Sequence, residues 1–170
     1  MNRLAALLLA ALVLLSCGTA TAADAARRGA PFQEGIELAS SVEGLEQGDV
    51  STSFSLLELR DLWIRVKVAR MAHTALLTLT FTTPRGEVFY ETRQLYTREP
   101  HATQVRIPSV RHPVTAFPAK RLHGGVALDQ PIPIGAGVFM RYPQAGTWLV
   151  QATLDGQRTL SARMDLSVAP

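Results

Sequence analysis

The chain has 170 residues, with 17 Lys or Arg, 14 Asp or Glu, a single Cys and a formal net charge of +3. This length is typical of one domain with a short tail. The charge is too small to indicate a nucleic-acid-binding protein, and 18% charged residues argue against a disordered chain. One cysteine excludes an intrachain disulfide framework and any multi-cysteine metal site.

The first 22 residues have the pattern of a secretory signal peptide. A basic start, Met1–Arg3, precedes the apolar run Leu4–Leu15, whose twelve residues suit a signal core. A membrane-spanning helix needs about 20 such residues. Ala20–Ala22 provides an A-x-A cleavage site. The predicted organisation is a signal peptide at 1–22, a flexible tether at 23–31 and a single domain at 32–170.

A second processing signal overlaps this leader. Leu14-Leu15-Ser16-Cys17-Gly18 resembles the bacterial lipobox, in which the cysteine is lipidated and becomes the first residue of the mature protein. The resemblance implies a signal segment of 1–16, a lipid anchor on Cys17, and a periplasmic or outer-membrane-associated lipoprotein. In the alternative, Cys17 is removed with the leader and the protein is soluble in the periplasm or secreted.

Residues 62–97 predict three strands. Alternate residues from Leu62 to Val68 are apolar and β-branched, which indicates a half-buried strand. A helical turn at 55–61 is an alternative interpretation of the preceding segment. In a helical interpretation Asp61 and Arg65 would be spaced as an ion pair. Apolar side chains alternate with threonines in the next segment, and Pro84–Glu87 is a turn, so that 75–97 forms a hairpin.

Prolines dominate the middle of the chain. Those between 98 and 124 exclude a long helix and favour short edge strands or loops, for example at Thr103–Ile107. Val126–Ile134 contains two further prolines and is predicted to be an edge strand. Val138, Met140 and Tyr142 then alternate into a turn at 143–146.

The last part of the chain predicts a hairpin. Apolar residues alternate from Trp148 to Leu154 and from Leu160 to Val168, and Asp155-Gly156 between them is typical of a turn with two positive φ angles. About seven or eight short strands without alternating helices indicate an all-β fold, an antiparallel immunoglobulin-like β-sandwich, with a barrel as the alternative. Gly146–Gly156 resembles the hairpins that end many bacterial envelope Ig-like modules, which implies a fold and a habitat.

The sequence provides no catalytic or cofactor motif. The four histidines, His73, His101, His112 and His123, match no metal-ligand spacing. There is no G-x-S-x-G or S-x-x-K sequence, and the serines at 40–55 lie in a turn-rich stretch where they cap backbone groups. We expect a protein that is not an enzyme and that binds no metal or cofactor.

Charge is distributed unevenly. Residues 32–61 carry seven acids against one base, a balance of −6, and 93–123 carry six bases against one acid, a balance of +5. The six bases form a candidate surface for an anionic partner. They are Arg93, Arg98, Arg106, Arg111, Lys120 and Arg121. In the alternative, the acidic and basic segments pack against each other or solvate opposite faces.

Trp63 lies on the opposite face of its strand from the apolar residues, so it is a candidate for stacking on a sugar or partner; packing under a loop is the alternative. We expect an exported, non-catalytic cell-envelope protein that binds or scaffolds other components. The alternative is a carbohydrate- or anion-binding accessory module that uses Trp63 and the basic 93–123 segment. The expected partners are envelope proteins or an anionic glycan or lipid surface, and the membrane through Cys17, but no nucleic acid.

Cys17→Ala tests the anchor. We expect the unaltered protein to fractionate with membranes and to carry a fatty-acyl mass on its mature N-terminus, and Cys17→Ala to lose both. Mass spectrometry of the purified protein measures this directly. An unmodified, soluble protein that begins at Ala23 would contradict the lipoprotein prediction.

Overall fold

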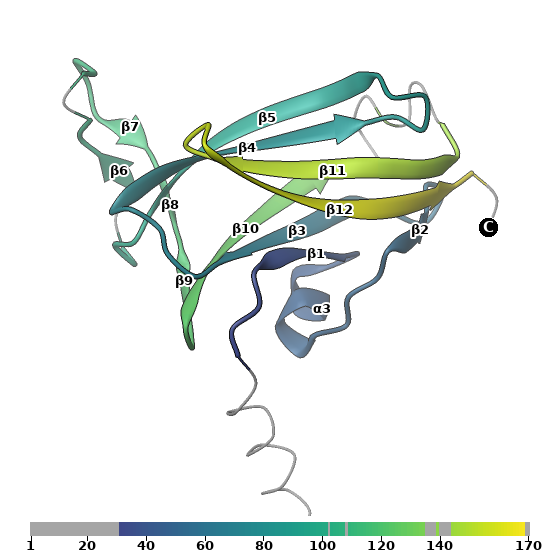
Figure 1. Ribbon diagram of the computed structural model, residues 1–170, viewed down its shortest axis with the longest axis horizontal. Coiled ribbons are helices and arrows are strands. Elements are labelled where there is room, and N and C mark those ends of the chain that lie inside the picture. Colours follow the sequence, from purple (N-terminus) through teal and green to yellow (C-terminus); the bar gives the residue numbers. More distant parts are fainter. Residues whose placement is uncertain (1–30, 102, 108, 135–138, 140–143, 169–170) are drawn as a thin grey trace, which may run out of the picture. The chain divides into compact units, whose positions relative to one another are not determined.

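A computed structural model of the chain describes residues 31–101, 103–107, 109–134, 139 and 144–168 (Figure 1). Its strands all belong to one compact unit, Gln33–Pro170. Cys17 and the leader lie outside the described residues. In chain order the elements are β1 (Gly35–Ala39), α3 (Val42–Gln47), β2 (Ser53–Ser55), β3 (Asp61–Val68), β4 (Thr74–Thr82), β5 (Val88–Thr97), β6 (Gln104–Val105), β7 (Val114–Thr115), β8 (Phe117–Pro118), β9 (Lys120–Leu122), β10 (Gly125–Pro133), β11 (Gly146–Leu154) and β12 (Arg158–Ser167).

The strands form two main sheets and one small ribbon. One sheet has the order β1-β3-β10-β9, the other has the order β2-β12-β11-β4-β5-β8, and β6 pairs with β7 (Figure 1). All long strands pair antiparallel, and the all-β prediction is confirmed. Two short edge segments differ, because β2 pairs parallel with β12 and β8 pairs parallel with β5.

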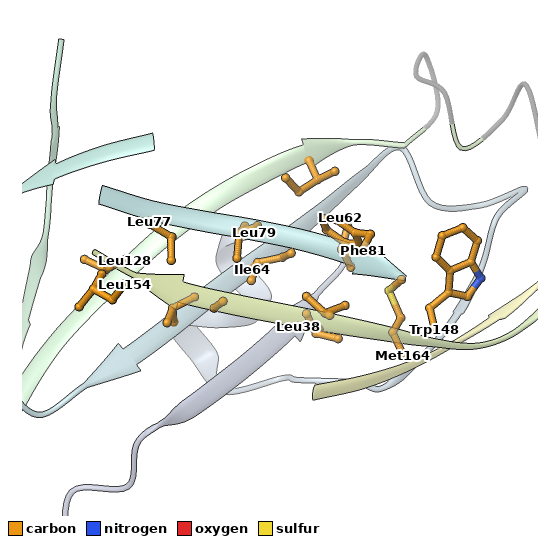
Figure 2. Packing of buried hydrophobic residues seen from close by; sticks show 14 of the residues in the cluster. Leu38, Leu62, Ile64, Leu77, Leu79, Phe81, Leu128, Trp148, Leu154 and Met164 are labelled. Atoms are coloured by element: carbon orange, nitrogen blue, oxygen red, sulfur yellow. The ribbon is translucent and has the colours of Figure 1, made fainter. Parts of the chain in front are cut away.

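Side chains from both main sheets form one apolar core (Figure 2). The alternate residues of β3 from Leu62 to Val68 are buried, as are Leu77, Leu79 and Phe81 of β4 and Trp148 of β11. These are the faces that the alternation predicted. Full burial of each large apolar side chain stabilises the fold by about 1.5–3 kcal/mol, so the packing of the two sheets supplies the main stabilising term.

The predicted turns have the expected backbone conformations. Gly86 in the β4–β5 turn has φ 86°, and Asp155 and Gly156 in the β11–β12 turn have φ 51° and 70°. Asp155 also ties this turn to β4, since its N–H donates to the Leu76 carbonyl (2.9 Å) and its Oδ1 accepts from the Leu76 N–H (2.8 Å). Both hairpins are confirmed.

The prediction of an edge strand at Val126–Ile134 is wrong in part. β10 lies inside its sheet, between β3 and β9. However, β9 pairs only with Gly125–Ala127, so the half of β10 that holds Pro131 and Pro133 has β3 on one side alone among the described strands. Proline removes a ladder donor and is tolerated at such an open side. The prediction holds for the proline-containing half only.

Outside the long strands, the other predictions concern short segments of the chain. The strand expected near Thr103–Ile107 is β6, and the Ser55 carbonyl accepts from the N–H of Leu59 (3.0 Å) in a helical turn before β3. β1 and α3 were not predicted. Most of the alternating segment at Val138–Tyr142 and Pro143 lie outside the described residues.

Helix α3 has clear end signals. Ser41 is its N-cap and accepts from the N–H of Gly44 (3.0 Å), and Gly48 ends the helix in the left-handed conformation with φ 77°. Leu45 is the buried residue of the helix. Both signals are present in the sequence, but six residues are too few for a visible apolar periodicity.

Arg65 joins α3 to the sheet. It lies on the face of β3 opposite the core, as its parity predicts, yet it is only 6% exposed. Its guanidinium donates to both carboxylate oxygens of Asp129 (2.7 Å each), to Glu46 Oε1 (2.8 Å) and to the Leu45 carbonyl (2.7 Å). Since the hydrogen bonds with Asp129 favour the charged form most strongly, they raise the pKa of Arg65. The helical pairing of Arg65 with Asp61 does not occur.

Arg65→Leu tests this arrangement. The substitution leaves Asp129 and the Leu45 carbonyl without their donor, so we expect the free energy of unfolding to fall by about 2–4 kcal/mol. Denaturant titration measures it. The control is Arg163→Leu on the exposed face of β12, which should change stability by less than about 0.5 kcal/mol. Equal effects of the two substitutions would contradict a stabilising role for Arg65.

Candidate functional site

Three of the six predicted basic residues line one hollow, which we call the basic groove. It is formed by Arg98, Pro100, Pro118, Ala119, Lys120 and Arg121 and has a cavity volume of about 480 Å³. An adjoining hollow of about 310 Å³ shares Arg98, Pro100 and Arg121 and adds His73 and Glu99. Residues some 20 positions apart in the sequence are therefore brought to one surface.

The crossing of the chain between the two sheets builds the basic groove. β8 pairs with the end of β5, where Tyr96 lies beside Phe117 and Thr97 beside Pro118. The Ala119 N–H then donates to the Thr97 carbonyl (2.7 Å). Immediately afterwards, β9 pairs with β10 of the other sheet. The segments that follow β5 and β8 thus become two walls of the same hollow.

Tyr96 anchors this crossing. It is buried, its hydroxyl donates to the Asp129 carbonyl on β10 (2.8 Å), and its ring lies against Phe117 with centroids 6.3 Å apart. It therefore connects β5, β8 and β10 next to the basic groove. Burial is the main cause that raises the pKa of Tyr96, and the nearby Asp129 carboxylate adds to it.

The charge of the basic groove is only partly compensated. Lys120 forms an ion pair with Glu46 of α3, and His73 Nε2 lies 3.0 Å from Glu99 Oε1. Arg98 and Arg121 are exposed, and neither has an acidic partner within ion-pair distance among the described residues. Two guanidinium groups are thus available to an anion, and a guanidinium can bind a carboxylate, sulfate or phosphate through two parallel hydrogen bonds.

The other predicted basic residues lie elsewhere. Arg93 is on β5 and pairs with Glu91 (2.8 Å). Arg106 follows β6 and Arg111 lies between β6 and β7, both exposed on the separate ribbon. The structure therefore divides the predicted surface into a groove, a strand edge and a ribbon.

Trp63 does not join the basic groove. It is partly buried on the outer face of β3, in register with Ala39 and Pro131. The nearest part of the groove in register is Lys120, beside Ala127 and Lys67. Four residues of strand, about 13 Å, separate Lys67 from Trp63. The single surface of the alternative hypothesis is thus not formed as one contiguous site.

The ion pair between Glu46 and Lys120 connects the acidic and basic segments. Hydrogen bonds from Lys120 first, and then from Arg65, lower the pKa of Glu46 below its ordinary value. The alternative in which the two segments pack against each other therefore describes this one contact. It does not describe Arg98 or Arg121, which have no such partner among the residues seen in the structure.

A separate hollow, which the sequence did not indicate, lies at β2. It has a volume of about 310 Å³ and is lined by Ser40, Asp49, Ser51, Ser53, Phe54, Ser55, Glu58 and Leu59. Ser51 Oγ accepts from the Ser53 N–H (3.1 Å) and donates to the Ser53 carbonyl (2.9 Å), as expected for serines that satisfy backbone groups. We therefore interpret this hollow as a product of the local turns.

Within the described residues, no group of three or more His, Cys, Asp or Glu side chains could hold a metal ion. The same residues include no helix that is long and apolar enough to cross a membrane. His101, His112 and His123 are exposed, and only His73 lies beside the groove residues.

The solved structures that are similar to this chain include the following two. The C-terminal domain of wzt has a TM-score of 0.40 and 11% sequence identity, over 79% of this chain and 72% of that chain. The Pseudomonas fluorescens alkylpurine DNA glycosylase AlkC, bound to DNA containing an abasic site analog, has a TM-score of 0.34 and 12% identity, over 78% and 30%. No family model and no curated protein matches. Likeness of this degree carries no functional argument.

Tyr96→Phe tests the anchor beside the groove. Because the folded-state pKa of Tyr96 is raised, its neutral form stabilises the fold at neutral pH, and this contribution declines as the pH rises past the unfolded value of about 10. We expect Tyr96→Phe to lower the free energy of unfolding by about 1 kcal/mol at pH 7, because the hydrogen bond is missing. Between pH 9 and 11, the free energy of unfolding of this variant should fall less than that of the unaltered protein. Urea titrations across this range measure both. Parallel pH profiles would contradict the assignment.

Proposed function

We propose that the protein is an exported, non-catalytic binding module of the cell envelope, and that its basic groove binds an anionic group of a glycan or a lipid. The observation that carries the proposal is the convergence of Arg98 and Arg121 on one hollow without acidic partners among the described residues. Uncompensated arginines on two walls of a groove favour an anion between them.

The chemistry of the lining supports binding over catalysis. Arginine remains protonated, and the proline and alanine side chains provide no nucleophile, acid or base. Lys120 is engaged by Glu46. The neighbouring His73 and Glu99 pair with each other at the exposed rim of the adjoining hollow. A general base would need a reactive group held beside it, and the groove lining supplies none.

The leader sequence supports a location in the cell envelope. The apolar run before Cys17 and the A-x-A site favour export, either as a lipoprotein anchored through Cys17 or as a soluble periplasmic or secreted protein. An anchored module would present its groove close to the membrane, where anionic headgroups and anionic glycans are the available ligands. The serine-lined hollow at β2 contains no basic residue and is a poorer candidate for such ligands.

Charge reversal in the groove tests the proposal. The variant is Arg98→Glu together with Arg121→Glu, and the matched control is Arg163→Glu on β12, an exposed arginine far from the groove in the strand order. The probes are heparin, as a sulfated glycan, and vesicles with and without phosphatidylglycerol. We expect the double variant to bind at least about ten-fold more weakly at low salt, and the control to change little.

The two probes and the salt dependence distinguish the outcomes. Binding to the unaltered protein should weaken as ionic strength rises, because exposed charges are screened. Stronger retention on heparin than on the anionic vesicles would assign a glycan, and the reverse would assign a lipid headgroup. Equal binding by the double variant and the unaltered protein would reject the basic groove as the binding surface.

A further inference from the structure

Within the part of the chain that the structure describes, β5 has an open edge over most of its length. It pairs with β4 on one side, and on the other side β8 pairs with Tyr96 and Thr97. Among the described residues no strand pairs with the outer side of Glu91–Leu95. An uncovered edge of this kind is a template for another strand.

The backbone groups that face outward can be identified. The Thr97 carbonyl points away from β4, because it accepts from the Ala119 N–H. In an antiparallel ladder such groups alternate, so Leu95, Arg93 and Glu91 point their N–H and C=O groups in the same direction. The outward hydrogen-bonding positions of the open edge are therefore these three residues.

Two of the three carry opposite charges on one face. Glu91 and Arg93 lie opposite Thr80 and Thr78 of β4, on the side of the sheet away from buried Phe81 and Leu79. Their side chains are 41% and 66% exposed, and they form an ion pair with each other (2.8 Å). Residues two apart on one strand that carry opposite charges are complementary to the same strand running in the reverse direction.

We propose that the edge of β5 is a self-association surface, on which two copies of the chain pair antiparallel about a two-fold axis at Thr92. In this register Glu91 of each copy lies opposite Arg93 of the other, as hydrogen-bonded pairs with their side chains on the same face. The paired stretch runs from 90 to 94, between the bulge that β5 forms at Phe89 and the residues that β8 covers. The six-stranded sheets of the two copies become continuous.

The ends of the stretch fit this arrangement. Val88 and Phe117 are among the exposed large apolar residues, and they flank the open edge at its two ends. The two-fold operation brings the Val88 end of one copy beside the β8 end of the other. A C2 interface of this kind closes on itself and leaves no new edge, which distinguishes it from open aggregation.

Charge exchange tests the pairing. All chains carry Cys17→Ala and are purified from the fraction to which they are exported, and sedimentation equilibrium measures the dimer dissociation constant. Glu91→Arg places like charges opposite each other twice and should weaken the dimer by about ten-fold. Glu91→Arg with Arg93→Glu restores the complementarity and should recover the dimer. Arg163→Glu, on β12, is the control and should leave it unchanged.

Cysteine cross-linking tests the register. Thr92 lies opposite itself across the two-fold axis in a non-hydrogen-bonded pair, where the Cα atoms are about 4.5 Å apart and a disulfide can form. Gln94 has the same parity and is also partly buried, but it lies opposite residue 90 of the other copy. Under mild oxidation Thr92→Cys should give a covalent dimer and Gln94→Cys should not.

Three results would overturn the proposal. One is a chain that remains monomeric at every concentration, which would leave the edge to a strand of another protein. Another is a dimer that Glu91→Arg does not weaken. The third is a disulfide in Gln94→Cys and not in Thr92→Cys, which would place the axis elsewhere. If Glu91→Arg fails to fold, the charge-exchanged double variant and the cysteine pair still decide.

Discussion

The buried guanidinium of Arg65 is the interaction on which the other parts depend. Removing this charge from water costs several kcal/mol, and only a full set of acceptors offsets that cost. Asp129, Glu46 and the Leu45 carbonyl supply them, so β10 must lie beside β3 and α3 must cover the outer face of the sheet. Glu46 also pairs with Lys120. The position of β9, and with it one wall of the basic groove, is thus connected to Arg65 through a single carboxylate.

The long strands could be predicted because each carries its own period-2 pattern. The core faces of β3, β4 and β11 and the positive φ angles at Asp155 and Gly156 follow from local sequence. Strand neighbours could not be predicted, because they depend on contacts between distant residues. β10 illustrates this, since its prolines indicate an edge while its other half pairs on both sides. Arg65 is a second example, because the alternation predicts which face of β3 it lies on but does not predict that α3 covers that face.

The residue composition of the candidate site could be predicted from the sequence, but its geometry could not. The excess of basic residues in 93–123 is visible in the sequence, and Arg98, Lys120 and Arg121 do converge. Their convergence depends on β8, two residues that pair parallel with β5 before the chain crosses to the other sheet. A strand of two residues is too short to produce a periodic pattern in the sequence. β8 also separates the two surfaces that we propose, the basic groove and the open edge of β5. The groove begins at β8, and the open edge ends where β8 pairs with β5.

Anion binding at the basic groove is tested most directly by an NMR titration of the isotope-labelled protein. A sulfated oligosaccharide is added while the backbone amide and arginine Nε signals are followed. We predict that the largest shifts occur at Arg98, Ala119 and Arg121, that they saturate, and that salt reverses them. Shifts confined to the serine-lined hollow at Ser51–Ser55, or to Arg106 and Arg111 on the ribbon, would contradict it.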